Sequence, residues 1–251
     1  GLKAYRAEDD KINIFRLRDN ILRMNKSAER MAMPDLEVES VVHAIQEFVK
    51  LQKDWVPSKK QGSLYIRPFM ISTDNTLRAI PSNSFRFMVI ACPVGFYYST
   101  AISLLLEKSY RRAATGGVGY AKAAGNYAAS FYPSHKAKEK GFDQILWTDV
   151  NNNNTLEELG SANFFFVKEG VLYTPEIHDS ILEGITRDTV IKLAQMSGIE
   201  VVEKQVPADE FEGALKNGKI DCMFATGTAA GITFVNSMSI DETLYSVDSD
   251  R

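Results

Sequence analysis

Apolar and polar residues alternate with two different periods along the first part of the chain. Residues 2–17 alternate around a polar turn at residues 8–10, which predicts a pair of strands. Apolar residues then recur every three or four positions over residues 18–31 and 39–55. This spacing predicts two helices, the second of which is ended by Pro57.

Two further strands are predicted from the apolar runs at residues 63–72 and 85–94. The second run is apolar on both faces, which predicts a strand in the interior of a sheet. A Thr-Gly-Gly-Val-Gly segment then follows two arginines, and its residues are small and flexible. We therefore predict a first domain of residues 1–111, a linker of residues 112–117 and a second domain of residues 118–251.

Shorter elements are predicted in the second half of the chain: helices at residues 127–140, 186–198 and 209–218, and strands at 144–149, 200–206 and 221–227. A polar turn is predicted at residues 151–154. Residues 163–174 read as a hairpin that turns at residues 168–170. Since strands and helices are mixed along the chain, the predicted fold class is α/β or α+β.

The bulk composition is that of an ordinary globular protein, with 45% of the 251 residues hydrophobic and 24% charged. The formal net charge of −3 gives no global attraction for nucleic acid or an acidic membrane. The longest apolar runs, such as residues 87–94, are too short to cross a bilayer. Cys92 and Cys222 lie far apart, so neither a disulfide framework nor a metal site is predicted, and a reduced, cytoplasmic setting is expected.

Lys122 is surrounded in the sequence by glycine and alanine residues, from Gly116 to Gly125. Small neighbours let the backbone approach a bound ligand closely, and a lysine in such surroundings could act as a nucleophile or a base. Alone, the same pattern also fits a solvated lysine on a flexible hinge. The segment lacks the Gly-Lys-Ser/Thr ending of a P-loop, so it does not indicate a nucleotide site.

Other candidate residues carry weaker signals. Thr186 lies near the predicted start of a helix, where backbone N–H groups and the helix dipole favour a phosphate, although most threonines there are plain caps. The turn after the strand at 221–227 could bind an anion or simply pack against a neighbouring strand. Glu158 before a strand and Arg23 on a helix would each, taken singly, be solvated charges.

The order and spacing of these segments resemble a known family. Glu158–Phe165, Leu172–Thr174 and Leu182–Arg187 together resemble the signature of the class IV aminotransferases. Within that class the chain is similar to the branched-chain aminotransferases. The segments that carry this likeness occur in the expected order: GLKAYR, RMNKSAERM, GSLYIRPFM, GGVGYAKAAGNYAAS, GITRD and TGTAA. The resemblance runs from residue 1 to about residue 235.

This resemblance implies a two-domain fold of type IV, with a smaller N-terminal α/β domain and a larger, β-rich C-terminal domain with helices. It also implies a homodimer that transfers the amino group of leucine, isoleucine or valine to 2-oxoglutarate, with pyridoxal 5′-phosphate (PLP) as cofactor. A D-amino acid aminotransferase, an aminodeoxychorismate lyase or a non-catalytic PLP-binding protein of this fold are the alternatives. The chain enters the family pattern partway and reaches a polar tail at residues 246–251, so relatives are expected to extend beyond it at both ends.

The resemblance implies roles for individual residues. Lys122 matches the lysine that binds PLP covalently, Glu158 the carboxylate that binds the pyridine nitrogen, and Tyr127 the tyrosine near the phenolic oxygen. The residues implied in phosphate binding are Arg23, the backbone of Ile185 and Thr186, and Gly227 with Thr228. Those implied in substrate binding are Tyr65, Arg67, Thr228 and Ala229.

Overall fold

The computed structural model describes residues 1–150 and 154–247. The chain forms two compact units, Gly1–Tyr97 and Tyr98–Arg251. Residues 98–111, predicted to belong to the first domain, and the predicted linker at 112–117 lie in the second unit. The reason is a strand at residues 102–107 that pairs on both sides with strands of the second unit.

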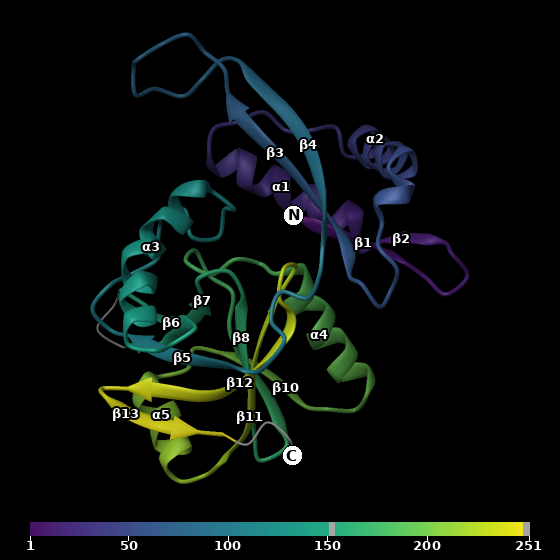
Figure 1. Cartoon of the computed structure of the whole chain (residues 1–251). Helices are drawn as coiled ribbons and strands as arrows, with labels where there is room; N and C mark the ends of the chain where they lie inside the picture. The colour runs from purple at the N-terminus through teal and green to yellow at the C-terminus, as the bar shows by residue number, and fades with distance from the viewer. Residues whose placement is uncertain (151–153, 248–251) are drawn as a thin grey trace. The chain divides into compact units, whose positions relative to one another are not determined.

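The first unit is a four-stranded antiparallel sheet whose one face is covered by two helices (Figure 1). The strand order is β2 (Ile12–Ile14), β1 (Leu2–Arg6), β3 (Ser63–Ser72) and β4 (Phe85–Val94). The helices are α1 (Leu17–Arg30) and α2 (Val38–Leu51), followed by the 3-10 helix η1 (Lys53–Trp55). Ile21 of α1 and Ile45 of α2 are buried against Leu64 and Ile66 of β3, as the helical and alternating spacing of these residues predicts.

Strand β4 forms an edge of this sheet, since β3 is its partner within the described residues and no strand follows it in the order. The prediction that the apolar run at 85–94 lies inside a sheet is therefore wrong. Every residue of β4 is half-buried or exposed, and Ile90 is 55% exposed. The run reflects the strand preference of aromatic and β-branched residues and not the covering of two faces.

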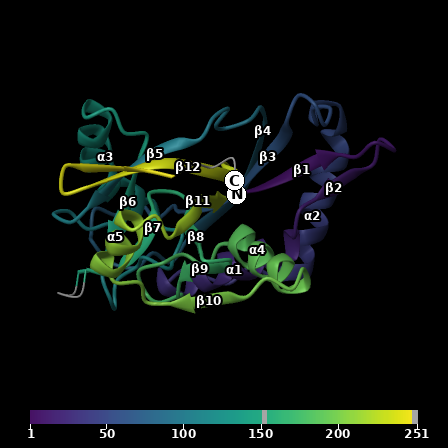
Figure 2. The same cartoon turned by 90° about the horizontal axis from the view of Figure 1, so that it is seen from below.

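The second unit contains a curled, mixed sheet that has nine strands among the described residues (Figures 1 and 2). Its order is β10–β9–β8–β11–β12–β5–β6–β7, and β13 pairs with β12. The strands are β5 (Ile102–Glu107), β6 (Gln144–Thr148), β7 (Leu156–Leu159), β8 (Asn163–Lys168), β9 (Val171–Pro175), β10 (Val201–Lys204), β11 (Ile220–Gly227), β12 (Gly231–Ile240) and β13 (Thr243–Ser246). The pairs β5–β6, β5–β12 and β9–β10 are parallel, whereas the remaining pairs are antiparallel.

Several of these strands confirm the predictions, and others were not foreseen. The hairpin of β8 and β9 turns at Glu169 and Gly170, whose positive φ angles of 51° and 80° suit a two-residue hairpin turn. Strands β5, β7, β12 and β13 are not among the predicted elements. The predicted polar turn falls mainly on residues 151–153, and the predicted polar tail on residues 248–251, both outside the described residues.

The helices of the second unit are α3 (Ala124–Glu139), α4 (Ile185–Met196) and α5 (Ala208–Lys216). Ala137 of α3 packs against Trp147 of β6, and Ile191 of α4 belongs to the cluster around β8 and β11. Phe211 of α5 lies edge-on to Phe164 of β8. Among the residues the structure describes, no helix combines the length and hydropathy needed to cross a membrane.

Candidate active site

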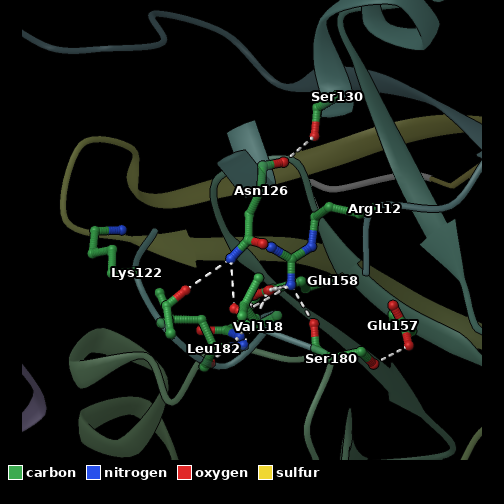
Figure 3. Close-up of polar contacts among 12 residues, drawn as sticks. Arg112, Val118, Lys122, Asn126, Ser130, Glu157, Glu158, Ser180 and Leu182 are labelled. Atoms are coloured by element: carbon green, nitrogen blue, oxygen red, sulfur yellow. Dashed lines mark hydrogen bonds and ion pairs between the residues drawn. The ribbon is translucent and has the colours of Figure 1, made fainter. Parts of the chain in front are cut away.

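Lys122 and Tyr127, which share one sequence motif, and Glu158, which begins another, line one pocket of the second unit. Lys122 directly precedes the N-cap of α3, Tyr127 lies in the first turns of that helix, and Glu158 lies on β7. Figure 3 shows the polar contacts around this pocket. The fold thus joins residues that the sequence alone could only relate by resemblance.

The position of Lys122 is fixed by its own loop and by the start of α3. Buried Asn126 donates its side-chain N–H groups to the carbonyls of Val118 and Ala121, each at 2.8 Å (Figure 3). The exposed amine of Lys122 donates to the hydroxyl of Tyr127 at 2.5 Å. A short loop and one helical turn therefore hold the amine and the phenol together.

Gly119 allows this loop to lie against a second one. A Cβ atom at Gly119 would lie 2.5 Å from the Cα of Ser180 and 2.6 Å from its carbonyl oxygen, so a side chain would clash with backbone. The N–H of Tyr120 also donates to the carbonyl of Asp179 at 2.9 Å. The loop before Lys122 and the loop around Ser180 consequently form one wall of the pocket.

Glu158 is buried and surrounded by donors. Its Oε1 accepts from the N–H of Leu182 at 3.0 Å and lies 2.6 Å from the guanidinium of Arg112, while its Oε2 accepts from Asn163 at 3.0 Å. Burial raises the pKa of Glu158 to about 7, against the lowering effects of Arg112 and the Leu182 N–H. The side chain is therefore an oriented acceptor whose charge depends on its neighbours.

Helix α4 begins beside Glu158. It starts at Ile185 after Gly184, an N-cap residue that has no side chain with which to cap the first turn. A Cβ atom at Gly184 would lie 2.0 Å from Oδ1 of Asn163, the residue that also binds Glu158. The backbone of Ile185 and Thr186 thus stands at a helix N-terminus, as predicted, where the helix dipole favours an anion.

The predicted turn of small residues also lies next to the pocket. Gly227 ends β11, and residues 228–230 form the turn into β12. A Cβ atom at Gly227 would lie 3.1 Å from the carbonyl oxygen of Ser161, and Ser161 lines the pocket. Thr228 and Ala229 are therefore part of a tight hairpin turn, as the sequence predicts.

The remaining predicted residues, Arg23, Tyr65 and Arg67, belong to the first unit. Arg23 is half-buried on α1, where its guanidinium donates to Asn20 at 3.3 Å. Tyr65 and Arg67 lie two positions apart on β3, and the guanidinium of Arg67 lies 5.3 Å from the centre of the Tyr65 ring. Their proposed contacts with cofactor or substrate stay predictions.

Three polar residues of the site were not singled out from the sequence: Arg112, Asn126 and Asn163. Asn163 lies inside the signature segment that begins at Glu158, which is the signal that could have identified it. Arg112 gave no such signal, because it flanks a run of small residues that resembles a linker. Its burial is explained by its tertiary partner Glu158.

Comparison with known proteins shows the family of this chain. The family model of the amino-transferase class IV matches residues 4–238. The chain belongs to the class IV aminotransferases.

Relatives of this class IV aminotransferase include branched-chain-amino-acid transaminase 1 of Bacillus subtilis. It is 46% identical over 244 residues, which are 96% of this chain and 68% of the relative. A crystal structure of the Thermoproteus uzoniensis branched-chain aminotransferase with norvaline matches with a TM-score of 0.82 at 29% identity, covering 100% of this chain and 79% of that one. The branched-chain amino acid aminotransferase of Thermobaculum terrenum, in its PLP form, matches with a TM-score of 0.80 at 28% identity, covering 94% and 75%. These matches confirm the predicted family and its type IV fold.

Proposed function

We propose that this enzyme transfers the amino group of leucine, isoleucine or valine to 2-oxoglutarate, with PLP bound covalently at Lys122. The observation that carries the proposal is the pocket in which the amine of Lys122, the hydroxyl of Tyr127 and the buried carboxyl of Glu158 come together. The names of the relatives support the branched-chain substrates.

The residues of the pocket suit PLP. Glu158 is held by three donors so that it can accept a further hydrogen bond, which is what a protonated pyridine nitrogen requires. The start of α4 and the turn after Gly227 are both places where backbone N–H groups bind phosphate. The PLP form of the Thermobaculum terrenum enzyme supports the same cofactor here.

The chemistry assigned to the chain follows from these positions. When bound, PLP supplies an electron sink for the pair left on the substrate α-carbon as its proton leaves. Once the substrate amine has displaced it from PLP, the amine of Lys122 would take that proton from one carbon atom and deliver it to a second one. The Tyr127 hydroxyl, at 2.5 Å, would orient the amine. The carboxylate of Glu158 would raise the proton affinity of the pyridine nitrogen.

Further roles are proposed for residues at the edge of the pocket and in the first unit. The phosphate would be bound by Arg23, the backbone of Ile185 and Thr186, and Gly227 with Thr228. The substrate would be contacted by Tyr65, Arg67, Thr228 and Ala229. Arg67 is proposed to bind the second carboxylate of glutamate or 2-oxoglutarate, because a guanidinium binds carboxylate at two points.

The covalent attachment can be tested directly. Borohydride reduction of the PLP-loaded protein, followed by peptide mapping, should find the cofactor on Lys122. Lys138 and Lys140, near the end of α3, serve as internal controls because they lie outside the pocket. Cofactor found on either of these, or on no lysine, would reject the assignment.

The alternatives are outcomes of a second experiment. Leucine added to the loaded protein should change the visible absorption of the cofactor rapidly, and 2-oxoglutarate should restore it. A response to D-leucine but not L-leucine would indicate a D-amino acid aminotransferase. No response to either would indicate an aminodeoxychorismate lyase or a binding protein without turnover. We also propose that the protein is cytoplasmic and forms a homodimer. Light scattering of the full-length protein that shows only a monomer at micromolar concentration would contradict the homodimer.

A further inference from the structure

Arg112 is a buried cation at the centre of the pocket wall. Its side chain is 5% exposed, and its guanidinium lies 2.6 Å from the carboxyl of Glu158, which is 6% exposed. Arg112 also donates to the carbonyls of Gly119, at 3.3 Å, and Ser180 (Figure 3). Carbonyls do not neutralise a charge, and a buried charge without a partner is costly, so Glu158 is the group that makes the burial of Arg112 tolerable.

Two buried glutamates that are adjacent in the sequence differ in their contact with this cation. Glu157 and Glu158 follow one another on β7, where successive side chains point to opposite faces of the sheet. Glu157 accepts a hydrogen bond from the hydroxyl of Ser180, whereas Glu158 forms the ion pair with Arg112. The geometry therefore directs the arginine's charge to one of the two carboxyls, the one that lines the pocket with Lys122.

The contacts of Arg112 also join the segments that build the site. Gly119 belongs to the loop that leads to Lys122, and Ser180 belongs to the loop whose Leu182 N–H donates to Glu158. One side chain consequently fixes both the carboxyl and the two loops on either side of it. Loss of the guanidinium would loosen all three together.

We propose that Arg112 is a positioning residue of this site, which keeps Glu158 as an oriented carboxylate and holds the loop of Lys122 beside it. The proposal deepens the proposed function, because an oriented carboxylate at this place serves the pyridine nitrogen. The charged groups that act on Glu158 are Arg112, Lys122 and Glu157, and Arg112 is the strongest of those that lower its pKa. Arg112 thus opposes the effect of burial, which favours the neutral acid.

The ion pair can be tested without cofactor. Carbon-13 NMR of the cofactor-free chain, labelled at glutamate carboxyls, would follow the titration of Glu158, whose resonance is identified by its loss in Glu158→Gln. Arg112→Met should raise the pKa of Glu158 by about 1–3 units, the range for loss of an adjacent opposite charge. Arg112→Lys keeps a cation and should raise that pKa less than Arg112→Met does. An unchanged titration in Arg112→Met would overturn the proposal.

A matched control separates this effect from a general loss of packing. Arg187 is likewise buried, at 6% exposure, with an ion pair to Glu203 at 2.7 Å and a bond to the carbonyl of Pro175 at 2.9 Å. Arg187→Met should destabilise the fold in a comparable way but leave the Glu158 titration in place. If both arginine variants shift that titration equally, Arg112 acts through the fold alone and the proposal fails. If Arg112→Met fails to fold, kcat of Arg112→Lys in the parent chain and in Glu158→Gln still decides: an equal loss in both would overturn the proposal.

Kinetics of the loaded enzyme give a second, independent readout. Arg112→Met loses both the charge and the two-point contacts of the guanidinium. Its kcat for the leucine half-reaction should fall about 10–100-fold, the range for residues that orient metal ligands. Arg112→Lys keeps the charge and loses only the two-point contacts, so its kcat should fall less. In a Glu158→Gln background both substitutions should reduce kcat less than in the parent chain, because the part of the effect that acts through Glu158 is already lost. Full additivity would refute the proposal. A protein that binds no PLP would refute the proposed function, while the NMR titration would still decide the role of Arg112.

Discussion

The proposed function needs Glu158 as a carboxylate, whereas the stability of the fold favours its neutral acid. Burial raises its pKa from 4.5 to about 7, so the folded chain holds this proton more tightly than the unfolded chain does. The protonated acid therefore favours the folded state at pH values below the unfolded-state pKa of 4.5. This stabilisation is lost as the pH rises through the folded-state pKa of about 7. Glu158 should therefore destabilise the cofactor-free protein most above pH 7.

The size of the effect follows from the shift. The rise of the Glu158 pKa from 4.5 to about 7 corresponds to about 3 kcal/mol, most of which develops between pH 5 and pH 8. Glu158→Gln removes the titration but keeps a carbonyl that can accept from Arg112 and Leu182. The unfolding free energy of the variant should thus rise by about 2–3 kcal/mol relative to that of the parent chain between these two pH values.

The assay can use the chain's own fluorescence. Trp147 is fully buried on β6 and reports on the second unit, whereas Trp55 is 62% exposed in the first. Urea unfolding of parent and Glu158→Gln at pH 5, 6, 7 and 8 gives the difference in free energy at each pH. Glu210→Gln, which removes a partly exposed carboxylate paired with Lys204, is the matched control and should differ from the parent by less than about 0.5 kcal/mol throughout. A difference for Glu158→Gln that is flat with pH, or that falls as pH rises, would refute the reasoning.

Three further predictions concern catalysis and loop packing. Glu158→Gln should reduce kcat by about 10²–10³ in stopped-flow half-reactions, because one electrostatic contact with the reacting system is lost; unchanged turnover at saturating leucine would assign the pyridine nitrogen to another group. Arg67→Leu should weaken the half-reaction with 2-oxoglutarate by roughly 2–5 kcal/mol and affect the leucine half-reaction far less; equal losses would show that Arg67 does not discriminate between the substrates. Gly119→Ala should lower the unfolding free energy by about 1–3 kcal/mol in urea unfolding followed by Trp147 fluorescence, because its Cβ would meet the backbone of Ser180. Gly125→Ala, which meets no atom within 4 Å on α3, should instead stabilise the chain by about 0.5–1 kcal/mol, and equal effects of the two alanines would contradict the predicted clash.

Local periodicity was sufficient for the elements that bury one continuous face. Helices α1, α2 and α4 and strands β3 and β11 lie within a few residues of their predicted ranges, because each carries a strong apolar repeat. Strand β7 was missed because its sequence, Leu-Glu-Glu-Leu, places two acids in the middle of a strand that is buried throughout. Only their tertiary partners make these acids compatible with the interior.

The predicted linker is a second segment whose structure could not be decided from the local sequence pattern. Small residues at 115–119 fit a flexible connection and a close approach of two loops equally well, and the structure has the second arrangement. The roles of Lys122, Tyr127 and Glu158 came from the resemblance, and their place in one pocket agrees with it. Arg112 could not be found in this way, because the burial of an arginine depends on a carboxyl that is distant in the sequence.

The hydrogen bonds that build the pocket join residues at very different separations in the sequence, and contacts between distant residues form later in folding. Asn126 binds carbonyls only five and eight positions away, so the side of the pocket that carries Lys122 closes short loops. Arg112 binds Ser180 across 68 positions, which requires the closure of a long loop and the assembly of β7. The Asn126 contacts of the Lys122 loop can therefore form early in refolding. The contacts of that loop and of Arg112 with the Ser180 loop form only with the complete sheet, so recovery of cofactor binding should mark the end of folding.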